Sequence, residues 1–322
     1  MINHILVPLD GSALAECVLP HIMAIAPVTN ARVTLLHVLQ HPHNGNGSPA
    51  VDPVEWHLQK QKSEKYLEQM VNRLNDSGIL GVESVILEGN PANSVIDFAH
   101  NNNVDLIALS THGNSGLSGW NVSSVVQKIL LRSHKSILLV RAYLPTSIEK
   151  TKIRYKRLFV GMDCSPRSEF VLPFAISLAQ FHKSQIILEC AVEKPQAINR
   201  FPLSDEDTEL INKFVERNYQ AASRYFKQLI TQFSTKELKL KTHVSVGDNA
   251  IAVLHDMVEE SNADLMMLAA HGYSGDRRWP YGSVTTSFIA YGNTSLMIMQ
   301  DLPATEIHPT RAEMAVREGK GH

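Results

Sequence analysis

The sequence carries the stretch HILVPLDGS at residues 4–12 and a related stretch, RLFVGMDCS, at residues 157–165. Each is a short apolar run that leads into an Asp and a Ser. A second related pair follows in the same order: VDLIALSTHG at residues 104–113 and ADLMMLAAHG at residues 263–272. The first pair is offset by 153 positions and the second by 159, so the second copy contains six additional residues between its two stretches. Two matched pairs in one order indicate a tandem duplication with a join near residues 145–152.

Length and composition agree with two globular copies. The chain has 322 residues, which suggests two domains of about 150 residues each. Apolar residues make up 44% and charged residues 19%, a usage that excludes a disordered chain, a coiled coil or a collagen-like fibre. The net charge of −2 provides no strong field for nucleic acid or an anionic membrane, so neither is expected as a partner.

The sequence also predicts a cytoplasmic location. No apolar run approaches the roughly 20 residues that span a bilayer, and the start lacks a basic segment followed by an apolar one. The three cysteines, Cys17, Cys164 and Cys190, are scattered and form no metal-ligand spacing and no disulfide framework. Reduced thiols in a cytosolic protein are therefore expected.

Each copy alternates short apolar runs with helical stretches. The runs lie at residues 5–9, 33–39, 82–87, 106–110 and 136–140, and at residues 158–162, 185–191, 239–246, 265–269 and 295–299. Continuous apolar runs are typical of parallel strands that are covered on both faces. The predicted fold class is α/β, with two doubly wound, five-stranded parallel-sheet domains at residues 1–145 and 153–302 and a polar C-terminal tail at residues 303–322.

Ligands of such sheets bind beyond the carboxyl ends of the strands, where the strand order reverses. Asp10 and Asp163 follow the first strand of each copy, and glycine-rich loops at residues 113–124 and 272–283 follow the fourth. Glycines let backbone amides approach a phosphate, and the N-terminus of the following helix adds partial positive charge. Arg277 and Arg278 lie within the second loop, where they could hold a phosphate or face solvent.

These residues resemble the universal stress protein family, whose nucleotide-binding members carry a Gly-x2-Gly-x9-Gly-Ser/Thr loop, an early Asp and a His-Val pair that ends the second strand. The first copy matches this pattern at Pro8, Asp10, His37-Val38, Gly113 and Gly116, with Ser123-Ser124 in place of Gly-Ser. The second copy matches at Asp163, Gly272, Gly275, Gly282 and Ser283, with Cys190 interpreted as the residue in place of the valine. Both loops are three residues shorter than the family signature.

The resemblance implies Rossmann-like domains, similar to adenine nucleotide alpha hydrolases, that bind ATP or AMP with or without Mg²⁺. It implies that Asp10 and Asp163 accept hydrogen bonds from the ribose or hold the loop. Val38 and Cys190 would offer backbone groups to adenine, and the loop glycines with Ser124 or Ser283 would hold phosphates. The alternative that both Asp residues only cap helices, and that the loops bind nothing, stays open.

No catalytic residue and no metal site is predicted. The sequence contains no Gly-x4-Gly-Lys-Ser/Thr loop and no Gly-x-Ser-x-Gly elbow. At most slow ATP hydrolysis is expected. The leading function is a cytosolic stress-response or regulatory protein that binds an adenine nucleotide and acts on an unknown protein partner. The alternatives are a nucleotide-free interaction scaffold and an enzyme that acts on an adenylated substrate.

Two further expectations concern the relation between the copies. Their fifth strands, at residues 136–140 and 295–299, are apolar sheet edges, so we expect them to pair and form an intramolecular pseudo-dimer, with further dimerisation left open. We also expect the second copy to bind more tightly. Gly282 can take a positive φ more easily than Ser123, and the two arginines of the second loop add positive charge.

Overall fold

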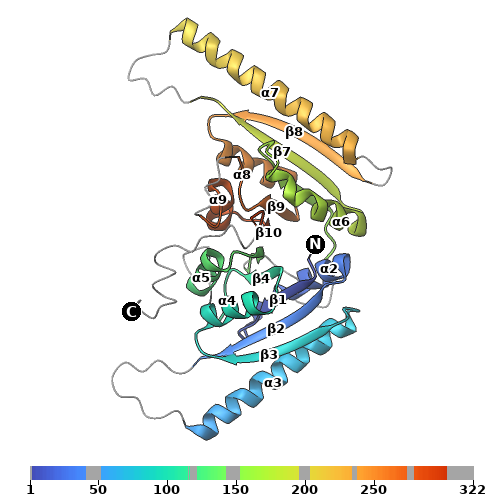
Figure 1. The fold of residues 1–322 in the computed structure, drawn as a ribbon, viewed down its shortest axis with the longest axis vertical. Helices are drawn as coiled ribbons and strands as arrows, with labels where there is room; N and C mark the ends of the chain where they lie inside the picture. The colour runs from blue at the N-terminus through green and yellow to red at the C-terminus, as the bar shows by residue number, and fades with distance from the viewer. Residues whose placement is uncertain are drawn as a thin grey trace. The chain divides into compact units, whose positions relative to one another are not determined.

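The computed structural model describes residues 2–40, 52–114, 116, 122–142, 153–195, 204–233, 238–273 and 279–302. The chain forms two compact units (Figure 1): unit one comprises Met1–Arg154 with Leu302–His322, and unit two comprises Tyr155–Asp301. The predicted polar tail at residues 303–322 lies outside the described residues.

Unit one alternates strands and helices along the chain. Its strands are β1 (His4–Pro8), β2 (Arg32–Leu39), β3 (Val82–Glu88), β4 (Leu106–Ser110) and β5 (Ser136–Val140). Its helices are α1 (Ala13–Glu16), α2 (Leu19–Thr29), α3 (Pro53–Asp76), α4 (Pro91–Asn101) and α5 (Ser124–Ser133).

Unit two repeats this arrangement. Its strands are β6 (Arg157–Gly161), β7 (Gln185–Glu193), β8 (Lys239–Gly247), β9 (Leu265–Ala269) and β10 (Leu296–Met299). A 3₁₀ helix, η1 (Ser168–Val171), precedes the helices α6 (Leu172–His182), α7 (Asp205–Phe233), α8 (Ala250–Ser261) and α9 (Ser283–Tyr291). Helix α7 has 29 residues and α3 has 24, which accounts for most of the additional length of the second copy.

The sheet topology confirms the predicted fold class. Unit one has the strand order β3-β2-β1-β4-β5 and unit two the order β8-β7-β6-β9-β10. Neighbouring strands within each unit are parallel. The strand order reverses between β1 and β4 and between β6 and β9, which is where a ligand site is expected. The pairing of the two units through their fifth strands stays a prediction.

Burial differs between inner and outer strands. Strands β4, β5 and β9 are buried along their whole length. Strands β3 and β8 are half-exposed, so the prediction that every strand is covered on both faces is wrong for these two. Both stand last in their strand orders, where α3 and α7 pack against only part of their surface (Figure 1). No helix in the described ranges is both long and apolar enough to cross a bilayer.

Helix α7 offers a matched pair of variants for the packing of unit two. Phe226 is 1% exposed and Phe214 is 50% exposed. Phe226→Ala should lower the free energy of unfolding of unit two by about 3–5 kcal/mol, because it leaves a cavity between helix and sheet. Phe214→Ala should change it by less than about 0.5 kcal/mol. Urea titrations followed by far-UV circular dichroism measure both, and equal effects would contradict the packing described.

Candidate functional site

Asp10 holds the loop after β4 against the end of β1. Its Oδ1 accepts hydrogen bonds from the Ser12 backbone amide (3.0 Å) and the Ser12 hydroxyl (2.6 Å). Its Oδ2 accepts one from the Asn114 backbone amide at 2.6 Å. The Asn114 side-chain amide donates in return to the Asp10 carbonyl at 2.9 Å. Of the two roles expected for this Asp, the structure shows the one of holding the loop.

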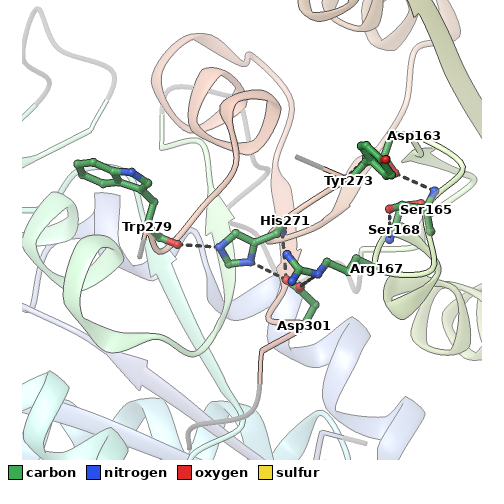
Figure 2. A network of polar contacts seen from close by, with 8 residues as sticks. All are labelled: Asp163, Ser165, Arg167, Ser168, His271, Tyr273, Trp279 and Asp301. Carbon is green, nitrogen blue, oxygen red and sulfur yellow. Dashed lines mark hydrogen bonds and ion pairs between the residues drawn. The ribbon is translucent and has the colours of Figure 1, made fainter. Parts of the chain in front are cut away.

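The first glycine of each loop is required by this contact. A Cβ at Gly113 would lie 2.1 Å from Asp10 Oδ2, and a Cβ at Gly272 would lie 2.3 Å from Asp163 Oδ2. Unit two repeats the arrangement (Figure 2): the Asp163 carboxylate accepts from the backbone amides of Ser165 and Tyr273. Any side chain at either glycine would therefore displace the carboxylate that fixes the loop.

The end of each loop is held by the backbone of the residue that directly follows the strand. The Ser123 amide donates to the Thr111 carbonyl at 2.9 Å, and the Gly282 amide donates to the Ala270 carbonyl at 2.8 Å. Ser123 then caps α5 through its side chain, which accepts from the Val126 amide. Helix α9 has no side-chain cap, since Gly282 stands at that position.

The conformational reason for expecting tighter binding in unit two is wrong. Gly282 has φ −71° and Ser123 has φ −68°, both in the extended region that any residue adopts. Ser123 therefore carries no backbone strain relative to Gly282. A Cβ at Gly282 would also find nothing nearer than 3.7 Å. The other reason rested on Arg277 and Arg278, which with Gly275 lie outside the described residues.

Unit one contains a cavity of about 700 Å³ at the switch point. Most of the predicted residues of this unit line it, namely Pro8, Asp10, Val38, Gly113, Ser123 and Ser124. Gly116 is not among the lining residues. Its φ is +74° and its amide donates to the Gly113 carbonyl at 2.8 Å, so it forms the tight turn within the loop.

Helix α3 supplies one wall of this cavity, which the sequence analysis missed. Its lining residues share one helix face, with spacings of three, four and seven positions: Gln59, Lys62, Ser63 and Tyr66. That spacing was the available signal, but nothing in the sequence indicated which element the polar residues would face.

Tyr66 is the aromatic side chain of this wall. Its ring packs edge-on against His37 at a centroid distance of 6.4 Å, and its hydroxyl is buried without a hydrogen-bond partner among the described residues. Burial, together with the nearby carboxylates of Glu16 and Asp10, raises the pKa of Tyr66. The hydroxyl therefore stays protonated at neutral pH, beside the Glu16 carboxylate.

The corresponding cavity in unit two is much smaller, about 130 Å³. It is lined by the predicted residues Asp163, Gly272, Gly282 and Ser283, but by no described residue of α7 and not by Cys190. The assignment of Cys190 to the place of Val38 is wrong. Pro8 pairs with Leu36 and Gly161 with Glu189, so Cys190 corresponds to His37 and Ala191 to Val38. Ala191 does line this cavity.

A buried ionic contact holds the loop of unit two (Figure 2). His271 Nδ1 lies 2.8 Å from Asp301 Oδ1, and its Nε2 lies 2.7 Å from the Trp279 carbonyl. Arg167 Nε lies 3.9 Å from Asp301 Oδ2. Both ring nitrogens face acceptors, so the imidazole must be protonated to satisfy both. Burial by itself lowers the pKa of His271, but the hydrogen bonds to Asp301 and Trp279 outweigh it and raise the pKa.

Across the described ranges, no group of three or more His, Cys, Asp or Glu side chains is arranged to hold a metal ion.

The His271 contact predicts a pH dependence of unit two. Its folded-state pKa is raised above 6.5, so its stabilisation is fully present below pH 6.5 and is lost as the pH rises through the folded-state pKa. The difference in unfolding free energy between wild type and His271→Gln should therefore shrink from pH 6 to pH 9. Urea titrations at a series of pH values measure this difference, and a constant value would contradict the assignment.

An independent control for that assignment is His21. Burial lowers the pKa of His21 to about 4. In NMR titrations the two imidazoles should thus titrate on opposite sides of 6.5.

Comparison with known proteins identifies the family. The family model for the universal stress protein family matches residues 1–141 and again residues 154–300. Two universal stress proteins of Methanocaldococcus jannaschii are each 27% identical, one over 138 residues (42% of this chain and 81% of the relative) and one over 156 residues (44% and 96%). The crystal structure of a universal stress protein from Archaeoglobus fulgidus superposes with a TM-score of 0.65 at 16% identity, covering 94% of this chain and 100% of that one. The chain belongs to the universal stress protein family and contains two of its domains in tandem.

Proposed function

We propose that unit one binds an adenine nucleotide, ATP or AMP, in its switch-point cavity. The observation that carries this proposal is the cavity itself. Its volume of about 700 Å³ falls within the range of about 300–1,000 Å³ typical of small-molecule sites. It also joins apolar strand ends to a loop and a helix N-terminus, an arrangement that suits a ligand with one flat apolar end and one anionic end.

The phosphate end would lie at the start of α5. Ser124 and Val125 line the cavity, and as first-turn residues their backbone amides have no acceptor within the helix. The helix dipole places partial positive charge at the same point. Lys62 approaches from α3 and contributes a full positive charge. All three residues line the same cavity, so they could hold one anionic group.

The base and sugar would lie toward β1 and β2. Val38 lines this part of the cavity and would offer backbone groups at the end of β2, and Tyr66 lines the cavity from α3. The Asp10 carboxylate retains lone pairs beyond those used by the loop and can accept from a ribose hydroxyl.

Among the described residues, no lysine or arginine of α7 lines the cavity of unit two. The helices α3 and α7 can be aligned through their tyrosines. Tyr225 of α7 donates to Glu169 at 2.7 Å, and Tyr66 of α3 lies near Glu16. The residues that follow the two tyrosines, Phe226 and Leu67, are both buried. In this alignment of the two helices, Ala221 stands where unit one has Lys62. Together with its smaller cavity, this supports unit one as the tighter site.

The proposed role is regulatory binding rather than rapid turnover. The sequence contains no P-loop, so fast ATP hydrolysis is not proposed. Occupancy of unit one would instead alter contact with a protein partner. The cytoplasmic location and a role in the stress response belong to this proposal.

Lys62 tests the phosphate end. Lys62→Ala should weaken ATP binding roughly tenfold or more, because it removes a charged hydrogen-bond donor, and should weaken AMP binding less. Lys65→Ala is the matched control, since Lys65 is an exposed lysine on the same helix that does not line the cavity. Isothermal titration calorimetry with ATP and AMP measures both. Equal affinities of the two variants would reject the contact.

The two loop glycines test which unit binds. Gly113→Ala and Gly272→Ala introduce the same steric conflict with an Asp carboxylate in their respective units. Gly113→Ala should abolish the tight site, whereas Gly272→Ala should preserve it, with about one tight ATP per chain by calorimetry. The reverse result would move the site to unit two. Absence of any tight site in the wild type, with no nucleotide released from the purified chain on denaturation, would favour the scaffold alternative.

A further inference from the structure

Two of the three cysteines meet in unit two. Cys164 Sγ lies 3.6 Å from Cys190 Sγ, although the two residues are 26 positions apart. Cys190 is buried on β7, whereas Cys164 is partly exposed in the segment between β6 and η1. Cys17 is in unit one, where its thiol contacts Ser110 Oγ at 3.5 Å. The thiols of Cys164 and Cys190 are thus close to each other, and Cys164 is partly exposed to solvent.

Cys164 occupies a backbone position that favours glycine. Its φ is +61°, in the left-handed region, and unit one has Gly11 with φ +83° at the corresponding place. A side chain at such a φ is destabilising relative to glycine, because its Cβ crowds the following carbonyl oxygen. Unit two therefore holds a thiol where a glycine would be less strained, and strained positions of this kind tend to occur at functional sites.

The electrostatic setting distinguishes the two thiols. The hydrogen bond between them lowers the pKa of Cys164. The same hydrogen bond, together with burial, raises the pKa of Cys190. Cys164 is therefore the more nucleophilic thiol, and Cys190 is held beside it as a protonated partner. Burial raises the pKa of Cys17, which makes that thiol unreactive by comparison.

We propose that Cys164 and Cys190 form a reversible disulfide that makes unit two responsive to the thiol–disulfide balance of its surroundings. The oxidant is a low-molecular-weight disulfide such as glutathione disulfide. The Cys164 thiolate attacks one sulfur of the oxidant, which forms a mixed disulfide and releases one glutathione thiolate. Cys190 loses its proton to solvent and attacks Cys164 Sγ, which forms the intramolecular disulfide and releases the second thiolate. Two protein thiols are oxidised and one small disulfide is reduced to two thiols.

Disulfide formation would affect the contact between Asp163 and the loop after β9. Bond formation must shorten the sulfur distance from 3.6 Å to about 2.05 Å, so the Cys164 segment must move toward β7. Cys164 directly follows Asp163, whose carboxylate holds the Tyr273 amide (Figure 2). Oxidation would thus link the segment after β6 covalently to β7. Unit one has Gly11 and His37 at these positions and contains no equivalent.

The experiment uses the full chain and does not depend on nucleotide binding. Purified protein is equilibrated in glutathione buffers of graded ratio, quenched in acid, unfolded in guanidinium chloride, alkylated with a maleimide and analysed by peptide mass spectrometry. The expected product is a monomeric chain that has lost two hydrogen atoms, with Cys164 joined to Cys190 and Cys17 alkylated. Dithiothreitol should restore all three thiols. The oxidised chain should also unfold thermally at a midpoint several degrees higher than the reduced chain, because the cross-link restricts the unfolded state.

Cysteine variants make the assignment decisive. Cys17→Ser should leave the disulfide unchanged, whereas Cys190→Ser should stop the reaction at a glutathione adduct on Cys164. Cys164→Gly, which restores the unit-one residue, should abolish the disulfide while keeping the reduced fold at least as stable. The proposal is overturned if the wild type stops at the adduct, if neither thiol reacts, or if the product is a disulfide between chains.

Discussion

Each unit depends on one carboxylate that binds a loop across the switch point. Asp10 and Asp163 stand at the ends of β1 and β6 and accept backbone amides from the loops after β4 and β9. The contact requires a glycine, because a Cβ at Gly113 or Gly272 would collide with the carboxylate. The loop glycine is therefore explained first by the fold and only secondly by the approach of a phosphate.

The same frame has diverged between the two copies. In unit one, α3 brings Lys62 and Tyr66 to an open cavity of about 700 Å³. In unit two, the cavity is about 130 Å³, and the loop is held by the His271–Asp301 contact, whereas His112 Nδ1 in unit one lies 3.1 Å from the Thr111 hydroxyl. One copy thus has a cavity of ligand size, whereas the other has ionic and thiol contacts around its own loop.

The thiol pair and the His271 contact both adjoin the contact between Asp163 and the loop after β9. Cys164 lies directly after Asp163, and His271 lies directly before Gly272. We propose that the first contact responds to oxidation, and the second responds to protonation; unit one has Gly11 and His37 at the positions of the two thiols. The Asp163 carboxylate lies against Gly272 and accepts a hydrogen bond from the Tyr273 amide. A change at Cys164 or at His271 therefore acts on the same loop contact.

The sequence by itself determined the duplication, the ten strands and the position of both loops, because apolar runs, Asp residues and glycines are local signals that repeat. It did not determine which helix face would meet the site, so Lys62 and Tyr66 were missed. Cys190 was assigned one position too early, although the offset of 153 positions between the copies already matches Val38 to Ala191, and the register of β6 and β7 agrees with that match. The proximity of Cys164 and Cys190, and the backbone angles of Ser123 and Gly282, were likewise decided by tertiary structure. Register, backbone conformation and contacts between distant residues arise from packing the sheet as a whole, which local sequence patterns do not specify.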